Sequence, residues 1–277
     1  MKTLLAAFLL ASCLLAQDPY TYSRAGAPND VTTPTSGGAV LMGGSRDVAE
    51  AFAWMIDRSG RGDFLVLRAA GTDAYNPFVL EQGPAHSAAT LIIRSRQAAS
   101  HPFVLEKVRH AEAIFLAGGD QWNYIRLWKD TPLARAIQQR IDAGVPIGGT
   151  SAGLAVLGQH YFSAEFDTIT SAEAEANPAS PKIALGRDFL RVPHLEDLIT
   201  DSHFSQRQRQ GRLAVFLRRI GGSRITGLGI DERTAVLLSP DGNARVVGAG
   251  AAHRLKNGQP PRSYPSGAAF SLRPPRE

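Results

Sequence analysis

The chain has 277 residues, of which 44% are apolar and 20% charged, with 27 glycines, 17 prolines and a single cysteine. This is the composition of a globular protein that is long enough to bury a large core. The formal net charge is +5, but the basic residues form no stripe with interleaved aromatic residues, so we expect no nucleic-acid partner.

The first 16 residues are typical of a secretory signal peptide. An apolar run, residues 4–15, follows Lys2 and ends at Ala16, and it is too short to span a bilayer. Cleavage after Ala16 would remove Cys13, which leaves no disulfide, thiolate metal site or cysteine nucleophile. The alternative is a lipoprotein signal with Cys13 as a lipid anchor. Either reading predicts a secreted or periplasmic protein of the bacterial cell envelope, with no membrane span.

Short apolar segments alternate with amphipathic ones from residue 37 onward. The apolar runs predict strands at 39–42, 64–67, 90–93, 114–116 and 145–147. Helical spacing predicts helices at 47–58, 103–110 and 133–143. Continuous apolar strands separated by helices indicate a parallel sheet that is covered on both faces.

The last third of the chain has a different pattern. It predicts a helix at 206–220 and then strands at 225–230, 234–238 and 244–247, which we expect to form a small meander. The proline-rich residues from 258 onward predict a loosely held terminus. We divide the chain into a signal peptide (1–16), an N-terminal segment (17–36), a single α/β domain (37–250) and a C-terminal tail (251–277).

Residues 149–153, Gly-Thr-Ser-Ala-Gly, match the pattern G-x-S-x-G and follow the predicted strand 145–147. Glycines on both sides of Ser151 permit the strained strand-to-helix turn that exposes a serine oxygen. The next helix would offer backbone N–H groups to an oxyanion. An ordinary glycine-rich β–α turn has the same residues, but the strand–turn–helix context favours a nucleophile.

A serine nucleophile needs a base and an orienting acid. No pair of the seven histidines is spaced as metal ligands on one helical turn, so we expect no metal site. His203 is a candidate base, although a histidine in a polar loop gives the same pattern. An acid at 231–232 could orient its imidazole, with Glu165, Asp167 and Asp201 as competitors. Spacing does not decide among them.

Three arginines follow His203 in the first half of the predicted helix. They are Arg207, Arg209 and Arg212, of which the last two share a helical face. Cations at this position oppose the helix macrodipole, which indicates carboxylate partners from the protein or from a substrate. Solvated surface arginines are the alternative.

Four segments, taken together and in order, resemble the cyanophycinase and dipeptidase E family of serine peptidases, peptidase family S51. They are residues 115–121, residues 148–153, residues 201–213 with Asp-Ser-His-Phe and the arginines, and residues 229–235. The resemblance runs from about residue 37 to residue 247. It implies a three-layer α/β sandwich with a mostly parallel central sheet, like class I glutamine amidotransferase domains, and a homodimer.

The resemblance also implies roles for site residues. Ser151 would be the nucleophile, His203 the general base and Glu232 the residue that orients His203. The oxyanion hole would be formed by backbone N–H groups of Ala152 and of the Gly119-Asp120 turn. Residues of the substrate pocket would be Gln121, Asp201, Arg207, Arg209 and Arg212, since guanidinium groups suit the carboxylates of aspartyl peptides. No cofactor is implied.

The resemblance therefore predicts a secreted serine exopeptidase that hydrolyses aspartyl bonds, β-aspartyl in the first place, in peptides or in a cyanophycin-like polymer. The chain departs from the family at Ser202, where glutamine is common, and this bears on β-aspartyl-arginine specificity. Three alternatives stay open. They are an α-aspartyl dipeptidase, an α/β-hydrolase-type esterase with His253 as base and Asp201 or Asp231 as acid, and a non-catalytic ligand-binding domain of the same fold.

Overall fold

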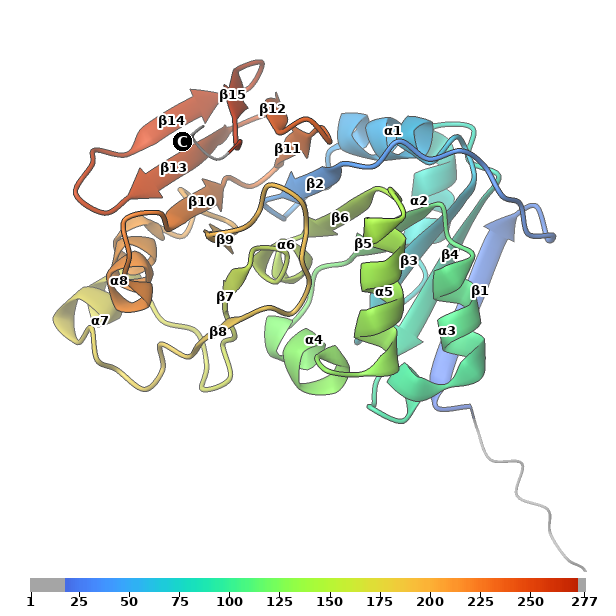
Figure 1. Ribbon diagram of the computed structural model, residues 1–277, viewed down its shortest axis with the longest axis horizontal. Coiled ribbons are helices and arrows are strands. Elements are labelled where there is room, and N and C mark those ends of the chain that lie inside the picture. Colours follow the sequence, from blue (N-terminus) through green and yellow to red (C-terminus); the bar gives the residue numbers. More distant parts are fainter. Residues whose placement is uncertain (1–17, 274–277) are drawn as a thin grey trace, which may run out of the picture.

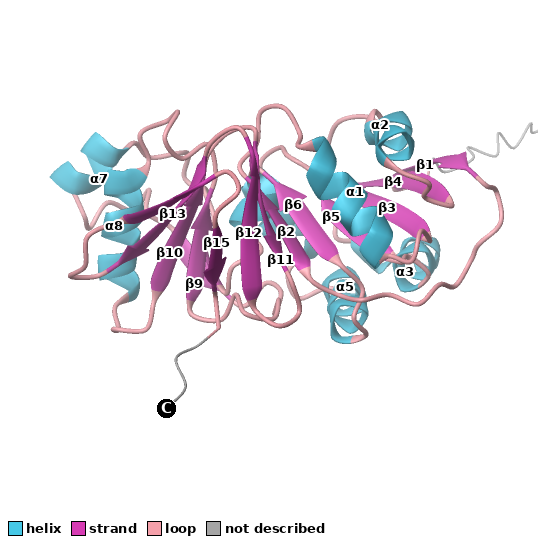
Figure 2. Ribbon diagram, turned by 90° about the horizontal axis from the view of Figure 1, so that it is seen from above, coloured by secondary structure: helices cyan, strands magenta, loops and turns pink. Residues whose placement is uncertain are grey.

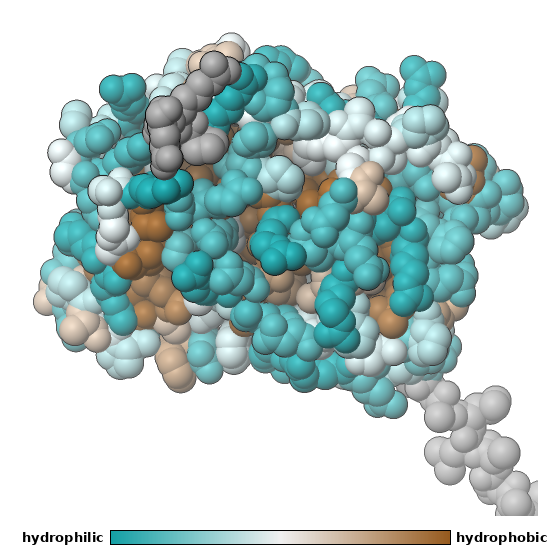
Figure 3. All heavy atoms as spheres, viewed as in Figure 1, coloured by the Kyte–Doolittle hydropathy of each residue, from teal (hydrophilic) through white to brown (hydrophobic). Residues whose placement is uncertain are grey.

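The computed structural model describes residues 18–273 (Figure 1). The signal peptide predicted at 1–16 and the alternative lipid anchor at Cys13 lie outside the described residues. No helix in the described part of the chain has the length and apolar character needed to cross a bilayer. In the view of Figure 3 most of the surface is hydrophilic, and apolar residues show only in patches between polar side chains.

A nine-stranded sheet has the order β1-β4-β3-β5-β6-β2-β11-β12-β15. Its strands are β1 (Tyr20–Gly26), β2 (Ala39–Met42), β3 (Asp63–Arg68), β4 (Ser87–Ile93), β5 (Ala113–Leu116), β6 (Ile147–Thr150), β11 (Thr234–Leu238), β12 (Asn243–Gly248) and β15 (Ala269–Ser271). The five from β4 to β2 are parallel, and the others are antiparallel to their neighbours. The parallel core is buried almost throughout, which confirms the prediction from the continuous apolar runs.

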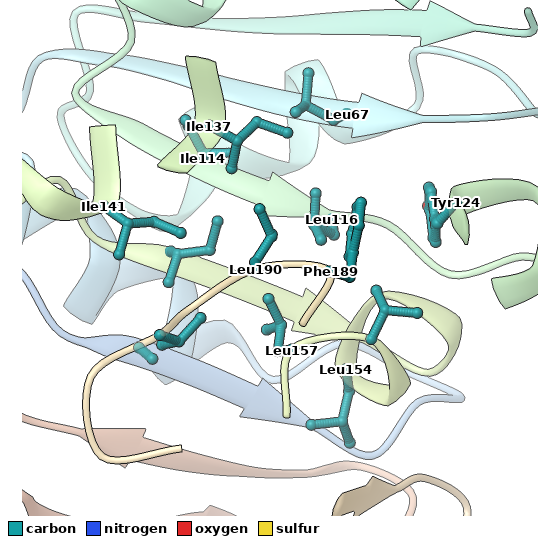
Figure 4. Close-up of a cluster of buried hydrophobic side chains, with 14 of the residues drawn as sticks. Leu67, Ile114, Leu116, Tyr124, Ile137, Ile141, Leu154, Leu157, Phe189 and Leu190 are labelled. Carbon is teal, nitrogen blue, oxygen red and sulfur yellow. The ribbon is translucent and has the colours of Figure 1, made fainter. Parts of the chain in front are cut away.

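Helices cover both faces of this sheet (Figure 2). They are α1 (Ala49–Arg58), α2 (Tyr75–Gln82), α3 (Pro102–Arg109), the 3₁₀ turn η1 (Ala98–Ser100), α4 (Gln121–Trp128) and α5 (Pro132–Asp142). The apolar faces of α1 and α2 pack into one core cluster, and those of α3, α4 and α5 pack into another. Figure 4 shows side chains of β3, β5, α5 and α6 in the second cluster. The three-layer α/β arrangement is the predicted fold class.

A second sheet lies beside the first along the long axis of the molecule (Figures 1 and 2). Its order is β14-β13-β10-β9-β7-β8. These strands are β7 (His160–Phe162), β8 (Leu185–Arg187), β9 (Leu198–Asp201), β10 (Thr226–Ile230), β13 (Ala251–Lys256) and β14 (Arg262–Pro265). Helices α7 (Ser171–Ala176) and α8 (Gln210–Ile220) pack against it in a third apolar cluster.

Three predictions for the last third of the chain are wrong. Strands β10 and β11 form no meander, because the turn at 231–233 carries the chain from one sheet to the other. Helix α8 begins at Gln210 and not at 206, since residues 203–209 form turns. The terminus predicted to be loose, from residue 258 onward, holds β14 and β15, whose backbone groups pair with β13 of the second sheet and β12 of the first. These strands are short and partly exposed, so their apolar pattern is weak.

Candidate active site

Ser151 stands between β6 and the short helix α6 (Ala152–Ala155), as the motif predicts. Its backbone has φ 53° and ψ −111°, which is a strained conformation for a residue other than glycine. The flanking glycines are required by close packing. A Cβ on Gly149 would lie 2.5 Å from the carbonyl carbon of Gly153, and one on Gly153 would lie 2.0 Å from the Leu116 oxygen. The turn therefore presents the serine at the carboxyl end of the parallel strands.

The hydroxyl of Ser151 meets an imidazole from the other sheet. Ser151 Oγ lies 2.8 Å from His203 Nε2, and His203 Nδ1 lies 2.7 Å from Glu232 Oε1. His203 follows β9 and Glu232 follows β10. Ser151 lies 52 positions before His203 and Glu232 lies 29 positions after it, and both contact the imidazole ring. The structure thus brings together the three residues to which the resemblance assigned the catalytic roles.

The competing acids contact other groups. Asp201 pairs with two arginines, and Asp231 contacts His253, whose Nε2 lies 3.1 Å from Asp231 Oδ1. Glu165 donates its backbone N–H to Ser163 Oγ, and Asp167 accepts from Thr168. The hydrogen bond of Ser151 is to His203 and not to His253, so the esterase order of residues finds no geometric support.

Residues 43–44 form a wall of the site that the sequence did not reveal. The His203 N–H donates to the Gly43 oxygen (2.8 Å), and the Arg233 N–H donates to the Gly44 oxygen (3.0 Å). Gly44 has φ 99°, and a Cβ there would lie 2.6 Å from the imidazole of His203. The glycine pair after the first parallel strand was the only signal, and turn glycines give the same pattern. Its role here is to let the backbone approach the imidazole.

The predicted oxyanion-hole residues lie on two segments next to Ser151. Ala152 follows Ser151 as the first residue of α6 and is buried. The 118–120 turn is close by, since a Cβ on Gly118 would be 3.5 Å from the Cβ of Ser151. Asp120 caps α4 by accepting a hydrogen bond from the Trp122 N–H (2.9 Å). The start of α6 and this turn offer backbone donors close to the serine.

The predicted substrate-pocket residues separate into two groups. Arg212 is only 2% exposed, and it binds Asp201 through Nε (2.8 Å) and Nη2 (2.6 Å). Its guanidinium lies over the rings of Phe162 and Phe216. Arg209 also contacts Asp201, at 3.2 Å. Asp201 and Arg212 therefore bind each other, so the carboxylate partner of Arg212 comes from the protein. Their role in substrate binding stays a prediction.

The other two predicted pocket residues, Arg207 and Gln121, belong to a second group with other contacts. Arg207 is exposed, and its backbone N–H donates to the His203 oxygen (3.0 Å). Its charge lowers the pKa values of both His203 and Glu232. Gln121 is the first residue of α4, and its Nε2 donates to the Phe162 oxygen (3.1 Å), which ties α4 to β7. The macrodipole argument does not apply to Arg207, since α8 begins after it.

We expect Arg212→Leu to lower the free energy of unfolding by about 3 kcal/mol, because it leaves the buried Asp201 carboxylate with Arg209 as its one cationic partner beside the Ser202 N–H. Urea unfolding measures this value. Arg218→Leu, an exposed position on the same helix, should change it by less than about 0.5 kcal/mol. The double variant Asp201→Asn/Arg212→Leu should recover part of the loss. An Arg212→Leu protein of wild-type stability with a raised KM would instead support the substrate-binding role.

The charges around His203 favour a neutral imidazole. Burial lowers the pKa of His203, the hydrogen bond to Glu232 raises it, and Arg207 and Arg209 lower it, with a net downward shift. The hydrogen bond from His203 lowers the pKa of Glu232. A neutral ring beside an ionised carboxylate is the state in which Nδ1–H donates to Glu232 and Nε2 is free to accept a proton.

Comparison with known proteins decides the family. Residues 36–246 match peptidase family S51. The chain belongs to peptidase family S51. It is 34% identical over 179 residues to the cyanophycinase of Geminocystis herdmanii, covering 64% of this chain and 61% of the relative. It is 31% identical over 173 residues to the cyanophycinase of Trichormus variabilis, covering 62% and 54%.

The match thus spans little more than half the length of these curated relatives. Among solved structures, the fold is similar to the crystal structure of a peptidase from an acI-B1 Actinobacterium, with a TM-score of 0.65 and 21% identity. That match covers 86% of this chain and 98% of the other. At this identity it establishes a shared fold for the S51 chain.

Proposed function

We propose that this S51 chain is a serine peptidase that hydrolyses aspartyl peptide bonds through Ser151, His203 and Glu232. The observation that carries the proposal is the continuous contact from Ser151 Oγ through the imidazole to the carboxylate, at 2.8 and 2.7 Å. The strained conformation of Ser151 adds to it, because strain at an exposed serine is typical of nucleophiles.

The reaction would proceed by acyl transfer. His203 Nε2 takes the proton of the Ser151 hydroxyl as Oγ attacks the carbonyl carbon, and N–H groups of Ala152 and the 118–120 turn bind the oxyanion. The imidazolium then gives the proton to the leaving amine as the C–N bond breaks. A water molecule, deprotonated by His203, attacks the acyl-enzyme and releases the acid and Ser151. Glu232 stays ionised and stabilises the imidazolium.

The substrate class is proposed from the relatives, which are named cyanophycinases. Arg207 is exposed and its charge lowers the pKa of His203, and its guanidinium suits a carboxylate of the substrate beside the scissile bond. With Arg209 and Arg212 committed to Asp201, the pocket would offer fewer free cations than the sequence indicates. We propose a β-aspartyl peptide, with its leaving amine on a basic residue, as the preferred substrate.

A substrate panel tests this function. We expect kcat/KM to be highest for β-Asp-Arg, lower for β-Asp-Lys and lowest for α-aspartyl dipeptides, with release of dipeptides from cyanophycin. A preference for α-aspartyl bonds would replace the β-aspartyl proposal. No cleavage by a folded protein, together with no labelling by a serine-directed phosphonate, would favour the non-catalytic ligand-binding domain.

We also propose that the enzyme works outside the cytoplasm, from the basic and apolar pattern of residues 1–16. The panel is therefore best run on protein recovered from the periplasm or medium of a bacterial host. A mature N-terminus at Gln17 in its mass spectrum would support export with cleavage, and a lipidated Cys13 would support the lipoprotein alternative. Full-length protein retained in the cytoplasm would contradict both.

A further inference from the structure

A second buried carboxylate lies directly beside Glu232. Asp231 is 6% exposed, and its two oxygens accept hydrogen bonds from different parts of the chain. Oδ1 accepts from the Ser205 N–H (3.0 Å) and contacts His253 Nε2 (3.1 Å), and Oδ2 accepts from the Ala251 N–H (3.1 Å). The carboxylate therefore joins three segments, namely the loop after β9, the turn after β10 and the start of β13.

Two of these segments carry residues of the proposed triad. Ser205 is two residues from His203, and Asp231 precedes Glu232 in the chain. The same two loops make other contacts. The Glu232 N–H donates to Gln206 Oε1 at 2.9 Å, and the Phe204 N–H donates to the Ile230 oxygen at 3.1 Å. The side chain of Asp231 adds to these contacts by accepting from the backbone N–H groups of Ser205 and Ala251.

His253 is itself fixed from two sides. Its Nδ1 lies 2.8 Å from Ser263 Oγ on β14, and the ring of Phe204 stacks on it with centroids 5.1 Å apart. Gly229 makes room for that ring, because a Cβ there would lie 2.2 Å from Phe204. Phe204 follows His203 directly, so the stacked pair restrains the catalytic loop against β10 and β13.

The charge on Asp231 suits this arrangement. Burial raises the pKa of Asp231, but hydrogen bonds from Ser205 and His253 lower it, and the net shift is downward. An ionised carboxylate accepts hydrogen bonds at both of its oxygens, whereas an amide of the same shape accepts only at its one oxygen. The backbone N–H groups of Ser205 and Ala251 thus depend on the charge of the side chain as well as on its shape.

We propose that Asp231 and His253 are a positioning pair, which holds His203 and Glu232 at their mutual distance without touching the reacting atoms. The two triad residues come from separate loops, and small errors in the placement of catalytic groups are costly in rate. Asp231 is the only side chain in the described residues that accepts from both the 205 and the 251 backbone. This inference rests on the proposed function.

Asp231→Asn tests the pair. The amide nitrogen must face the N–H of either Ser205 or Ala251, so one donor loses its acceptor. We expect kcat to fall about 10- to 100-fold with KM changed less than about threefold. The acid limb of the kcat/KM profile should also move to lower pH, because a loosened Glu232 raises the pKa of His203 less.

Asp63→Asn is the matched control. Asp63 is also 6% exposed, and it accepts from Ser87 Oγ (2.6 Å) and contacts His86 Nδ1 (2.9 Å), but at the start of β3. Its replacement should lower the unfolding midpoint and leave kcat, KM and the pH profile unchanged. If Asp231→Asn affects only the unfolding midpoint, as Asp63→Asn does, the pair is merely structural and the inference fails.

A double-mutant cycle adds a test that does not depend on one variant. His253→Gln should lower kcat less than Asp231→Asn, and the double variant should match the worse single variant, because both act through one contact. Additive losses would overturn the pairing. If Asp231→Asn fails to fold, His253→Gln alone still tests the inference. A wild-type pH profile in His253→Gln would overturn it.

The rate at which a serine-directed phosphonate labels Ser151 separates this inference from the proposed function. This rate needs no identified substrate and reports the same Ser151, His203 and Glu232 contacts. A wild-type protein that is labelled but cleaves none of the peptides overturns the substrate proposal and leaves the comparison of variants intact. A folded wild-type protein that is not labelled overturns the proposed function, and this inference with it.

Discussion

Ser151→Ala is expected to lower kcat by about 10⁶-fold, on the scale of nucleophile losses in other serine hydrolases. In the proposed mechanism the hydroxyl is the attacking group, and the imidazole cannot replace it. The Ser151→Ala protein should also lose labelling by a serine-directed phosphonate, as measured by mass spectrometry. The unfolding midpoint should stay close to that of the wild type, because alanine keeps the same Cβ at the positive φ of this position.

Ser59→Ala is the control for this result. Ser59 is fully buried, and its Oγ donates to the Ile56 oxygen (2.7 Å) at the end of α1. It should keep full turnover and labelling. Labelling that persists in Ser151→Ala at an unchanged rate would place the nucleophile elsewhere and would reject the proposed mechanism.

Glu232→Gln is expected to lower kcat by about 10³- to 10⁴-fold, as the loss of the third residue does in other triads. The glutamine amide can donate to Nδ1, which favours the tautomer with its proton on Nε2, and that nitrogen then cannot accept the serine proton. KM should change little. The pH profile of kcat/KM is the second measurement.

The sign of the pH effect follows from the pKa of His203. In the wild type this pKa lies below its usual 6.5, so activity should be lost only as the pH falls below that value. The hydrogen bond to Glu232 raises the pKa, so its removal should move the acid limb of the remaining activity to still lower pH. An acid limb that moves to higher pH would contradict the contact.

The acids that the sequence left in competition provide matched controls. Glu165→Gln and Asp167→Asn remove carboxylates that do not contact His203, so both should keep the wild-type pH profile. A profile that changes in either variant and not in Glu232→Gln would identify a different orienting acid.

Much of the first sheet could be predicted from the sequence, whereas in the second sheet only β10 was predicted. Strand β11 matches its predicted bounds, 234–238, because five buried residues give a continuous apolar run. No strand is predicted at β13 or at β14, which lies in the terminus predicted to be loose, because most of their residues are partly or fully exposed and β13 is stabilised by β10, which is distant in the chain. Backbone pairing with distant strands leaves little trace in local composition.

The arginines at 207–212 show the same difference between what the sequence predicts and what the tertiary structure decides. Arginines near a helix start predicted carboxylate partners, from the protein or from a substrate. The structure places Asp201 of β9 under Arg212 of α8, in a site closed by Phe162 and Phe216. The carboxylate partner of Arg212 comes from the protein and not from a substrate because Arg212 is buried. This burial depends on how α8 packs on the second sheet.

From the sequence alone we predict that a serine stands on a turn between a buried strand and a helix, because the glycines at 149 and 153 permit a strained turn. The structure adds that a Cβ on either glycine would clash with the backbone. The sequence did not determine which acid meets His203. Asp231 and Glu232 are neighbours in the chain, yet one binds the backbone of the loops and the other binds the imidazole. Both residues lie beyond Ile230, the last residue of β10, where the chain leaves the strand and turns. Which of the two carboxylates faces His203 depends on this turn and on the pairing of β9 with β10, and both are properties of the tertiary structure.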